Sequence, residues 1–265
     1  MSGTVLDQII QGVRADLAER QRSVSLADLK TAVLEQPAAL NALAALQQPG
    51  LAVIAEVKRR SPSKGELASI ADPAALARRY AEGGAAVVSV LTEERRFSGT
   101  LEDLDAVRAA IDIPVLRKDF TVDAYQIWEA RAHGADLVLL IVAALSDQQL
   151  ADFLALTEEL GMHALVETHT AEEVARALAV GARIIGVNVR NLKTLDVDRD
   201  VFAPLAAELP AGLVVVAESG VRDANDVARY ASEGATAILV GEALVSDSTP
   251  AERIAEFRAV AAQAN

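Results

Sequence analysis

Residues 51–65 read LAVIAEVKRRSPSKG. The first seven are apolar except for Glu56, and they have the length and composition of a buried strand. The Ser-Pro-Ser-Lys-Gly run that follows is typical of a tight turn. Because side chains alternate along a strand, Glu56 and Lys58 lie on one face, together with the apolar Ile54. A strand that could be wholly apolar therefore ends in two opposite charges.

Working outward from this strand, short β-branched runs alternate with amphipathic stretches that are typical of helices. The predicted strands are residues 52–58, 86–92, 114–120, 136–145, 163–169, 183–191, 213–219 and 236–244. Strands that alternate with helices pair in parallel. Eight such units within residues 51–265 predict an α/β protein built as a (β/α)8 TIM barrel, with a doubly wound open sheet as the alternative.

A weak internal repeat supports this count. Gly followed by Ala comes just before every second strand, at residues 84, 134, 181 and 234, with spacings of 50, 47 and 53. Each interval holds two strand-helix units, and a glycine at a helix end adopts a left-handed conformation that other residues resist. Chance in an Ala-rich chain is the alternative, but the near-equal spacing disfavours it.

Residues 1–50 stand outside this repeat and contain three predicted helices, at 4–21, 25–34 and 37–46. No Gly/Ser-rich linker separates them from the first strand. We therefore predict one domain over residues 1–265, in which residues 1–50 form a helical extension packed on the barrel of residues 51–265, over its mouth.

Composition excludes several classes of protein. The net charge of −13 disfavours binding to nucleic acid or to anionic membranes, so an anionic ligand requires a local basic pocket. The chain has no cysteine, which excludes disulfides, thiolate metal sites and cysteine nucleophiles. The N-terminus does not read as a secretory signal, and the longest apolar run, residues 137–145, is too short to span a bilayer. A cytoplasmic protein is expected.

The charges of residues 51–65 recur at the ends of other strands. On the predicted inward faces, the polar residue always comes late in its strand: Glu56 and Lys58, Lys118, Glu167, Asn188 and Arg190, and Glu218. The carboxyl ends of barrel strands meet at one mouth, where active sites of such barrels lie. Structural ion pairing would explain any single pair, but six charges from five strands predict a site that binds an anion and transfers protons.

Two late segments have residues suited to phosphate binding: VAESGV, residues 216–221, and LVGEALV, residues 239–245. Loops after the last two strands of such barrels often bind phosphate through backbone N–H groups. We expect these groups around Ser219, Gly220, Gly241 and Glu242. Ordinary turn glycines are the alternative at each position.

The segment IAEVKRRSPSKG closely resembles the signature of the indole-3-glycerol phosphate synthase family. The segments VLRKDF, ALVETHT, GVNVRNLKTLDVD, VAESGV and LVGEAL follow in that family's order, and the similarity covers essentially the whole chain. The resemblance implies a barrel with extra N-terminal helices and a carbon-carbon lyase of tryptophan biosynthesis. Its substrate would be 1-(2-carboxyphenylamino)-1-deoxyribulose 5-phosphate, which cyclises with loss of carbon dioxide and water. The resemblance implies neither a metal nor another cofactor. Its one partner would be this phosphorylated small molecule, and the chain would be a monomer or a weak homo-oligomer.

The resemblance also assigns roles at the reacting centre. Lys118 corresponds to the acid of ring closure, and Glu167 to the carboxylate at the dehydration step. Lys58 would lie near the leaving groups and Glu56 would relay protons, although which lysine acts at which step stays open. Asn188 would orient the substrate.

Other matched residues would bind the substrate. Arg190 suits the anthranilate carboxylate, and Glu218 with Ser219 would hold hydroxyl groups. The phosphate would be bound by Ser61, Gly220, Gly241 and the backbone of Glu242. Many relatives have serine at the position of Glu242, so we expect its carboxylate to turn away from the phosphate.

Some residues and readings stay open. His169 shares a strand face with Glu167 but lies beyond the strand, so a loop or capping role is expected. Arg59, Arg60 and Lys64 form a basic loop that either steers the phosphate or is a solvated turn. A Schiff-base aldolase, an isomerase and a noncatalytic phosphosugar-binding barrel remain alternatives.

Overall fold

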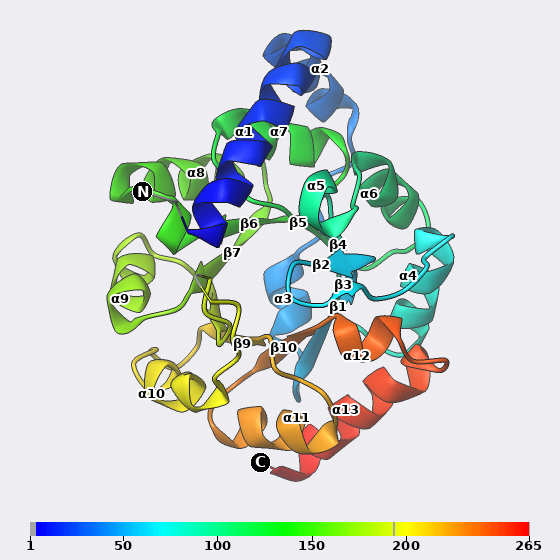
Figure 1. The fold of residues 1–265 in the computed structure, drawn as a ribbon, viewed down its shortest axis with the longest axis vertical. Coiled ribbons are helices and arrows are strands. Elements are labelled where there is room, and N and C mark those ends of the chain that lie inside the picture. Colours follow the sequence, from blue (N-terminus) through cyan, green and yellow to red (C-terminus); the bar gives the residue numbers. More distant parts are fainter. Residues whose placement is uncertain (1–3, 193, 265) are drawn as a thin grey trace.

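Eight parallel strands close into a barrel in a computed structural model that describes residues 4–192 and 194–264 (Figure 1). The barrel strands are β1 (Ala52–Val57), β4 (Val87–Leu91), β5 (Val115–Lys118), β6 (Leu137–Ile141), β7 (His163–Thr168), β8 (Ile184–Asn188), β9 (Val214–Glu218) and β10 (Ala237–Val240). Closure is direct, because β1 pairs with β4 on one side and with β10 on the other. The predicted TIM barrel is confirmed, and the open-sheet alternative is wrong.

The larger helices after the strands form a ring around the barrel (Figure 1). They are α4 (Pro73–Glu82), α6 (Leu101–Arg108), α7 (Ala124–Ala132), α8 (Asp147–Glu159), α9 (Ala171–Ala179), α10 (Phe202–Ala206), α11 (Ala224–Ser232) and α13 (Pro250–Ala264). The core consequently has two parts. Outward residues such as Ile185 and Val187 pack against the helices, whereas inward residues such as Leu116 and Leu165 fill the barrel. This is the alternation that the sequence predicted.

The four repeated glycines end helices as expected, because all four have positive φ: +87° at Gly84, +77° at Gly134, +80° at Gly181 and +102° at Gly234. All eight predicted strands are longer than the observed ones, and two of them run into a helical segment. Val142–Ala144 form a 3-10 turn, η1, and Glu242–Val245 form a short helix, α12. Apolar runs at these positions do not distinguish a strand from the first turn of the following helical segment.

Two short elements sit in the loops at the mouth. The Ser-Pro-Ser-Lys-Gly run turns between β2 (Arg60–Ser61) and β3 (Gly65–Glu66), which pair in antiparallel fashion. Helix α5 (Glu94–Phe97) lies in the loop after β4. The turn predicted in residues 51–65 is thus a small hairpin beside the end of β1.

The extension contacts both ends of the barrel. Helix α1 (Val5–Ser23) packs Ile9 and Val13 against Val122, and its first turns reach the mouth. Helix α2 (Leu26–Glu35) lies along α7, as Figure 1 also shows.

Helix α3 (Ala42–Leu46) instead inserts Leu43 and Leu46 into the barrel-interior cluster, beside Ala52 at the start of β1. The prediction that the extension lies over the mouth is therefore right for α1 only. The helix predicted at 37–46 begins at Ala42, because the side chain of Asn41 caps it. Residues 1–3 of the expected extension, and Lys193 in the quoted family segments, lie outside the described residues.

Within the described ranges, no helix combines the length and the apolar character that crossing a bilayer requires.

Candidate active site

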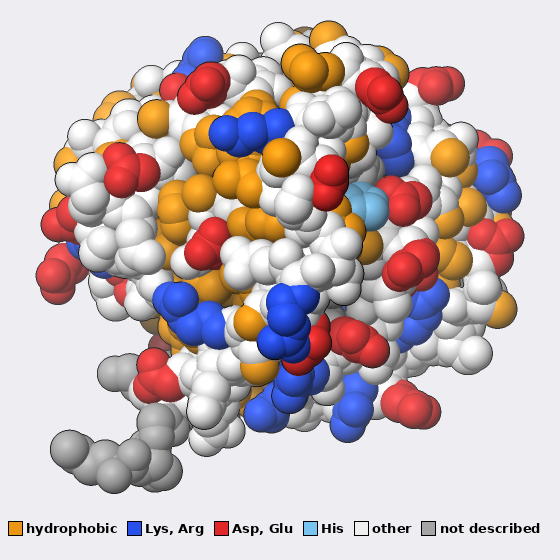
Figure 2. Space-filling view, turned by 90° about the horizontal axis from the view of Figure 1, so that it is seen from above, with side chains coloured by type: hydrophobic (Ala, Val, Ile, Leu, Met, Phe, Trp, Pro, Cys, Tyr) orange, Lys and Arg blue, Asp and Glu red, His pale blue; other side chains and the backbone are white. Residues whose placement is uncertain are grey.

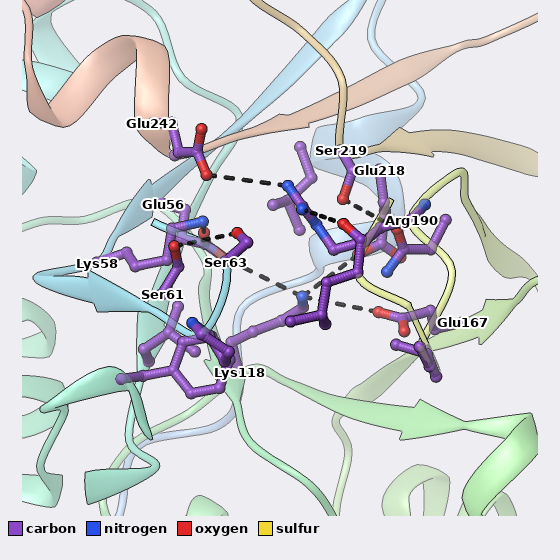
Figure 3. A pocket seen from close by; sticks show the side chains of 18 of the residues that line it. Glu56, Lys58, Ser61, Ser63, Lys118, Glu167, Arg190, Glu218, Ser219 and Glu242 are labelled. Carbon is purple, nitrogen blue, oxygen red and sulfur yellow. Dashed lines mark hydrogen bonds and ion pairs between the residues drawn. The ribbon is translucent and has the colours of Figure 1, made fainter. Parts of the chain in front are cut away.

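A cavity of about 340 Å³ opens at the carboxyl ends of the barrel strands (Figure 3). Its wall contains all the residues that the sequence proposed: Glu56, Lys58, Ser61, Lys118, Glu167, Asn188, Arg190, Glu218, Ser219, Gly220, Gly241 and Glu242. Other parts of the wall are apolar and come from several elements, including Val5 and Ile9 of α1, Phe97, Phe120 and Leu192. The site thus joins a charged floor to an apolar side.

Lys118 lies at the centre of the charged floor. Its Nζ is 3.4 Å from Oε2 of Glu218, 3.7 Å from Oε2 of Glu167 and 4.0 Å from Oε2 of Glu56. Burial lowers the pKa of Lys118, but the three carboxylates, Glu218 foremost, outweigh burial and hold this pKa above its usual value. Lys118 is therefore an ammonium group at neutral pH, aimed into the cavity.

Glu56 and Lys58, the charges that interrupt strand β1, pair with each other. Lys58 Nζ lies 2.7 Å from Oε1 of Glu56. Burial raises the pKa of Glu56, but Lys58 and Lys118 outweigh it and leave this pKa below its usual value. Pairing explains how both charges persist at a buried strand end, and the position of Lys58 in the cavity wall leaves its ammonium available to a ligand.

Glu167 and Glu218 differ in protonation although both are buried. Burial raises the pKa of Glu167, but Lys118 and His169 outweigh it and bring that pKa to about 2. Burial and the neighbouring Glu167 raise the pKa of Glu218 to about 8. One group is thus a carboxylate at neutral pH while the other holds a proton, a difference typical of acid-base sites.

His169 is the functional candidate that sequence reasoning undervalued. It has the expected capping contact, since its backbone N–H donates to Oε2 of Glu173 at 2.7 Å. In addition, its Nε2 lies 3.3 Å from Oε1 of Glu167. The available signal was its position two residues after Glu167, on the same strand parity.

Asn188 connects the ends of β8 and β9. Its Oδ1 accepts hydrogen bonds from Ser219 Oγ at 2.9 Å and from the backbone N–H of Arg190 at 3.0 Å. Ser219 has a φ of +70° and Gly220 a φ of +79°, so the chain turns sharply after β9. A non-glycine residue in this left-handed region is uncommon and is often found at functional sites.

Glu242 lies between two cations of the cavity wall. Its Oε2 is 2.6 Å from Lys64 Nζ. Its Oε1 is 3.9 Å from Nη2 of Arg190, as Figure 3 shows. The carboxylate therefore faces the basic groups of this wall. Of the basic loop, Lys64 lines the cavity, whereas Arg59 pairs with Asp103 through an Nη2–Oδ1 contact of 2.9 Å.

Two glycines make room for the buried carboxylates, and sequence reasoning assigned this role to neither. A Cβ on Gly186 would lie 2.0 Å from Oε1 of Glu218, and a Cβ on Gly241 would lie 2.5 Å from Oε1 of Glu56. Any larger residue would displace a charged side chain of the floor.

Within residues 4–192 and 194–264, no group of three or more His, Asp or Glu side chains is arranged to hold a metal ion.

Known proteins resemble this chain along nearly its whole length. A family model described as indole-3-glycerol phosphate synthase matches residues 6–257. The indole-3-glycerol phosphate synthase of Arthrobacter sp. (strain FB24) is 66% identical, with 98% of each chain covered. That of Paenarthrobacter aurescens (strain TC1) is 67% identical over the same shares. That of Mycolicibacterium gilvum (strain PYR-GCK) is 62% identical, covering 97% of this chain and 94% of the relative.

Solved structures share the architecture at much lower identity. A 3-hexulose-6-phosphate synthase superimposes with a TM-score of 0.63 at 19% identity, covering 80% of this chain and 99% of that chain. A thiamine phosphate pyrophosphorylase from Pyrococcus furiosus has a TM-score of 0.61 at 16% identity, covering 84% of this chain and 99% of that chain. These similarities show the fold alone.

Proposed function

The chain belongs to the indole-3-glycerol phosphate synthase family, as its motifs predicted, and from that premise we propose how the barrel mouth carries out the reaction. The reaction closes the ring of 1-(2-carboxyphenylamino)-1-deoxyribulose 5-phosphate with loss of carbon dioxide and water, a carboxy-lyase step of tryptophan biosynthesis. The observation that carries the proposal is the Lys118 ammonium, buried among the carboxyl groups of Glu56, Glu167 and Glu218 at the floor of the cavity.

Ring closure begins with Lys118. As the aromatic carbon attacks the substrate ketone, the carbonyl oxygen gains a proton, and the Lys118 ammonium donates it. Its carboxylate neighbours hold the group charged and oriented before the substrate arrives. The carboxylate of the substrate leaves as carbon dioxide from a nonaromatic intermediate, and the electron pair left behind restores the aromatic ring.

Dehydration then requires a base and an acid. Glu167 is the base, because Lys118 and His169 keep it ionised. Lys58 donates a proton to the departing hydroxyl, and Glu56, which lies 2.7 Å from Lys58 and within 4.0 Å of Lys118, relays protons between the two lysines.

Different residues of the cavity wall bind the two ends of the substrate. Arg190 pairs with the anthranilate carboxylate, Glu218 and Ser219 hold the hydroxyl groups, and Asn188 orients the chain between them. The phosphate is bound by Ser61, Gly220, Gly241 and the backbone N–H of Glu242. The carboxylate of Glu242 is held by its ion pair with Lys64, and the backbone N–H of Glu242 is the group that contacts the phosphate.

The remaining inferences concern the protein as a whole. We infer one domain over residues 1–265, because α1 and α3 of the extension pack at the two ends of the barrel. We further infer a monomer or weak homo-oligomer in the cytoplasm that binds neither nucleic acid nor anionic membranes, since a net charge of −13 repels both.

Indole fluorescence tests the scheme directly. Purified protein mixed with the carboxyphenylamino substrate should produce the indole signal. Lys118→Ala should reduce turnover by about 100-fold or more, and Glu167→Gln should reduce it too, because general acid-base groups contribute factors of about 10²–10⁴. Lys30→Ala, a change of an exposed lysine over Trp128, is the matched control and should have full activity. Full turnover in folded Lys118→Ala would refute its role.

A further inference from the structure

The ring of His169 lies between two carboxylates just after strand β7. Its Nδ1 is 3.0 Å from Oε2 of Glu173, and its Nε2 is 3.3 Å from Oε1 of Glu167. In the described part of the chain, the buried Nε2 has no hydrogen-bond partner, so its partner is this ionic contact. A neutral imidazole has a proton on only one nitrogen and would turn a lone pair towards one carboxylate. The doubly protonated ring presents a proton to both.

The negative charges of Glu167 and Glu218 are consequently balanced by different numbers of neighbouring cations. Glu167 has a cation at each oxygen, with His169 at Oε1 and Lys118 at Oε2. Glu218 has only the shared Lys118, 3.4 Å from its Oε2. Neither oxygen of Glu218 has a hydrogen-bond partner within residues 4–192 and 194–264. Two neighbouring buried carboxyl groups cannot both ionise cheaply, so the better-compensated group keeps the charge.

On the reaction scheme given above, we propose that His169 is a positioning residue whose imidazolium keeps Glu167 ionised and leaves the proton of the carboxyl pair on Glu218. Glu167 is then free to accept a proton from the substrate intermediate. Glu218, as a neutral acid, donates a hydrogen bond to a substrate hydroxyl. His169 itself acts through Glu167 and forms no bond with the substrate.

The surrounding charges support this assignment. The charged groups that face the cluster are Glu173 on α9, Lys118 on β5, Glu218 on β9, and Glu56 with Lys58 on β1, while β8 contributes the neutral Asn188. Burial lowers the pKa of His169, but Glu167 and Glu173 outweigh burial and raise it to about 10. The imidazolium therefore persists through neutral pH.

A nitrogen-15 NMR experiment on the full-length protein tests the charge of the ring without using activity. At pH 8, the long-range proton-nitrogen spectrum of the histidines should contain an imidazolium pattern that disappears in His169→Gln. If the signal lost in that variant has the pattern of a neutral tautomer, the proposal is wrong, whatever the enzyme catalyses.

The pH profile of turnover tests the consequence for Glu167. With the imidazolium gone, the pKa of Glu167 should rise, so the acid limb of kcat should move upward by about one pH unit or more in His169→Gln. A purely structural role would lower kcat by the same factor at every pH, and that result would overturn the proposal.

Glu173→Gln is a second variant, which keeps the imidazole of His169. It tests the proposal even if His169→Gln does not fold. Removal of the outer carboxylate should lower the pH at which the imidazolium signal titrates by about one unit or more, because one of its two anionic neighbours is lost. An unchanged titration in Glu173→Gln would count against the proposal. If the wild type forms no indole, the reaction scheme is refuted, but the NMR result on the charge of His169 still stands.

Discussion

Each carboxylate at the floor of the cavity has a different share of positive charge. Among the residues that the structure describes, Glu56 has Lys58 at 2.7 Å, Glu167 has His169 and Lys118, and Glu218 has Lys118 alone, which it shares with the other two. Glu218 is 1% exposed, so water cannot supply the missing compensation. At the residue scale, the three carboxyl groups therefore differ in how many cations lie beside them. This difference leaves Glu218 protonated, as an acid, and Glu167 ionised, as a base.

Glu218→Gln should be more stable than the wild type at high pH. Burial and Glu167 raise the pKa of Glu218 to about 8, above the value of a carboxyl group in the unfolded chain. Folding therefore favours the protonated form, and the wild type loses stability as the pH rises from about 4 towards 8. We expect the variant to melt roughly 4–8 °C higher at pH 9, corresponding to about 2 kcal/mol, and to match the wild type near pH 4. Thermal unfolding followed by circular dichroism at both pH values measures this.

The same stabilisation of Glu218→Gln at pH 4 and pH 9 would contradict the raised pKa. Near neutral pH this variant should keep much of its indole formation, because the amide, like the protonated carboxyl group, can donate a hydrogen bond to a substrate hydroxyl.

At the scale of elements, a glycine on strand β8 leaves space for a long side chain of the neighbouring strand β9. Gly186 of β8 lies beside the carboxylate of Glu218 on β9, and the two strands pair with Gly186 opposite Val216. The inward face of β8 is consequently small at this level, which allows the longer side chain of the neighbouring strand to occupy the barrel interior.

Gly186→Ala should disturb the site through this contact. The new Cβ would lie 2.0 Å from Oε1 of Glu218 and 3.3 Å from Leu165 Cδ1, so the carboxylate must move. We expect turnover to fall by about tenfold or more and stability to fall by about 1–3 kcal/mol. Gly12→Ala on α1 is the matched control, because there the Cβ would meet only the flexible side chain of Arg95. Equal activity in both variants would exclude a role for the space at Gly186.

Helix α1 is tied to the strand that carries Lys118. Arg20 Nε lies 2.8 Å from Glu129 Oε1 on α7, and Glu129 Oε2 lies 2.8 Å from Nη2 of Arg117 on β5. Arg117 is 3% exposed and also pairs with Asp119 at 3.1 Å. The extension and the barrel thus share one ion network next to the active site.

Removal of the central member of this network should cost far more than removal of its outer member. Glu129→Ala leaves the buried guanidinium of Arg117 with one partner fewer, and losses of about 3–5 kcal/mol are typical of such cases. Arg20→Ala removes a partly exposed partner and should cost about 1 kcal/mol or less. Urea unfolding of both variants measures the difference. Similar losses would mean that Arg20 contributes as much as the buried pair.

At the scale of the whole molecule, Figure 2 shows a stretch of hydrophobic side chains near the centre of the face that carries α2, with acidic and basic side chains mostly around it. The large hydrophobic side chains exposed in the described part of the chain are Val24, Leu26, Leu34 and Leu40. These four are spread over the helices and loops of the extension. Four strongly exposed side chains are few for a permanent interface, which has about 20–30 residues on each side.

Sedimentation velocity should therefore show a species near the chain mass of 27.9 kDa at micromolar concentration. The net charge of −13 adds mutual repulsion between copies, which weakens further in salt. A stable dimer that persists on dilution would contradict the inference of a monomer or weak homo-oligomer. Leu34→Glu, at the most exposed of these side chains, would then test whether α2 forms that interface.

The sequence by itself determined the number of strands, their inward and outward faces, and the residues gathered at the mouth. These features depend on period-two alternation and on glycines at helix ends, which are encoded within a few neighbouring residues. The motif from Glu56 to Gly65 was specific enough to predict the family.

Only the tertiary structure decided that α3 inserts at the far end of the barrel and that Gly186 leaves room for Glu218. The uneven protonation of Glu167 and Glu218 likewise emerged only there. Each of these depends on groups far apart in sequence, or on burial, and both are set by closure of the barrel. Local patterns place a side chain on a face of its strand, but distances and desolvation across the barrel decide what that side chain meets.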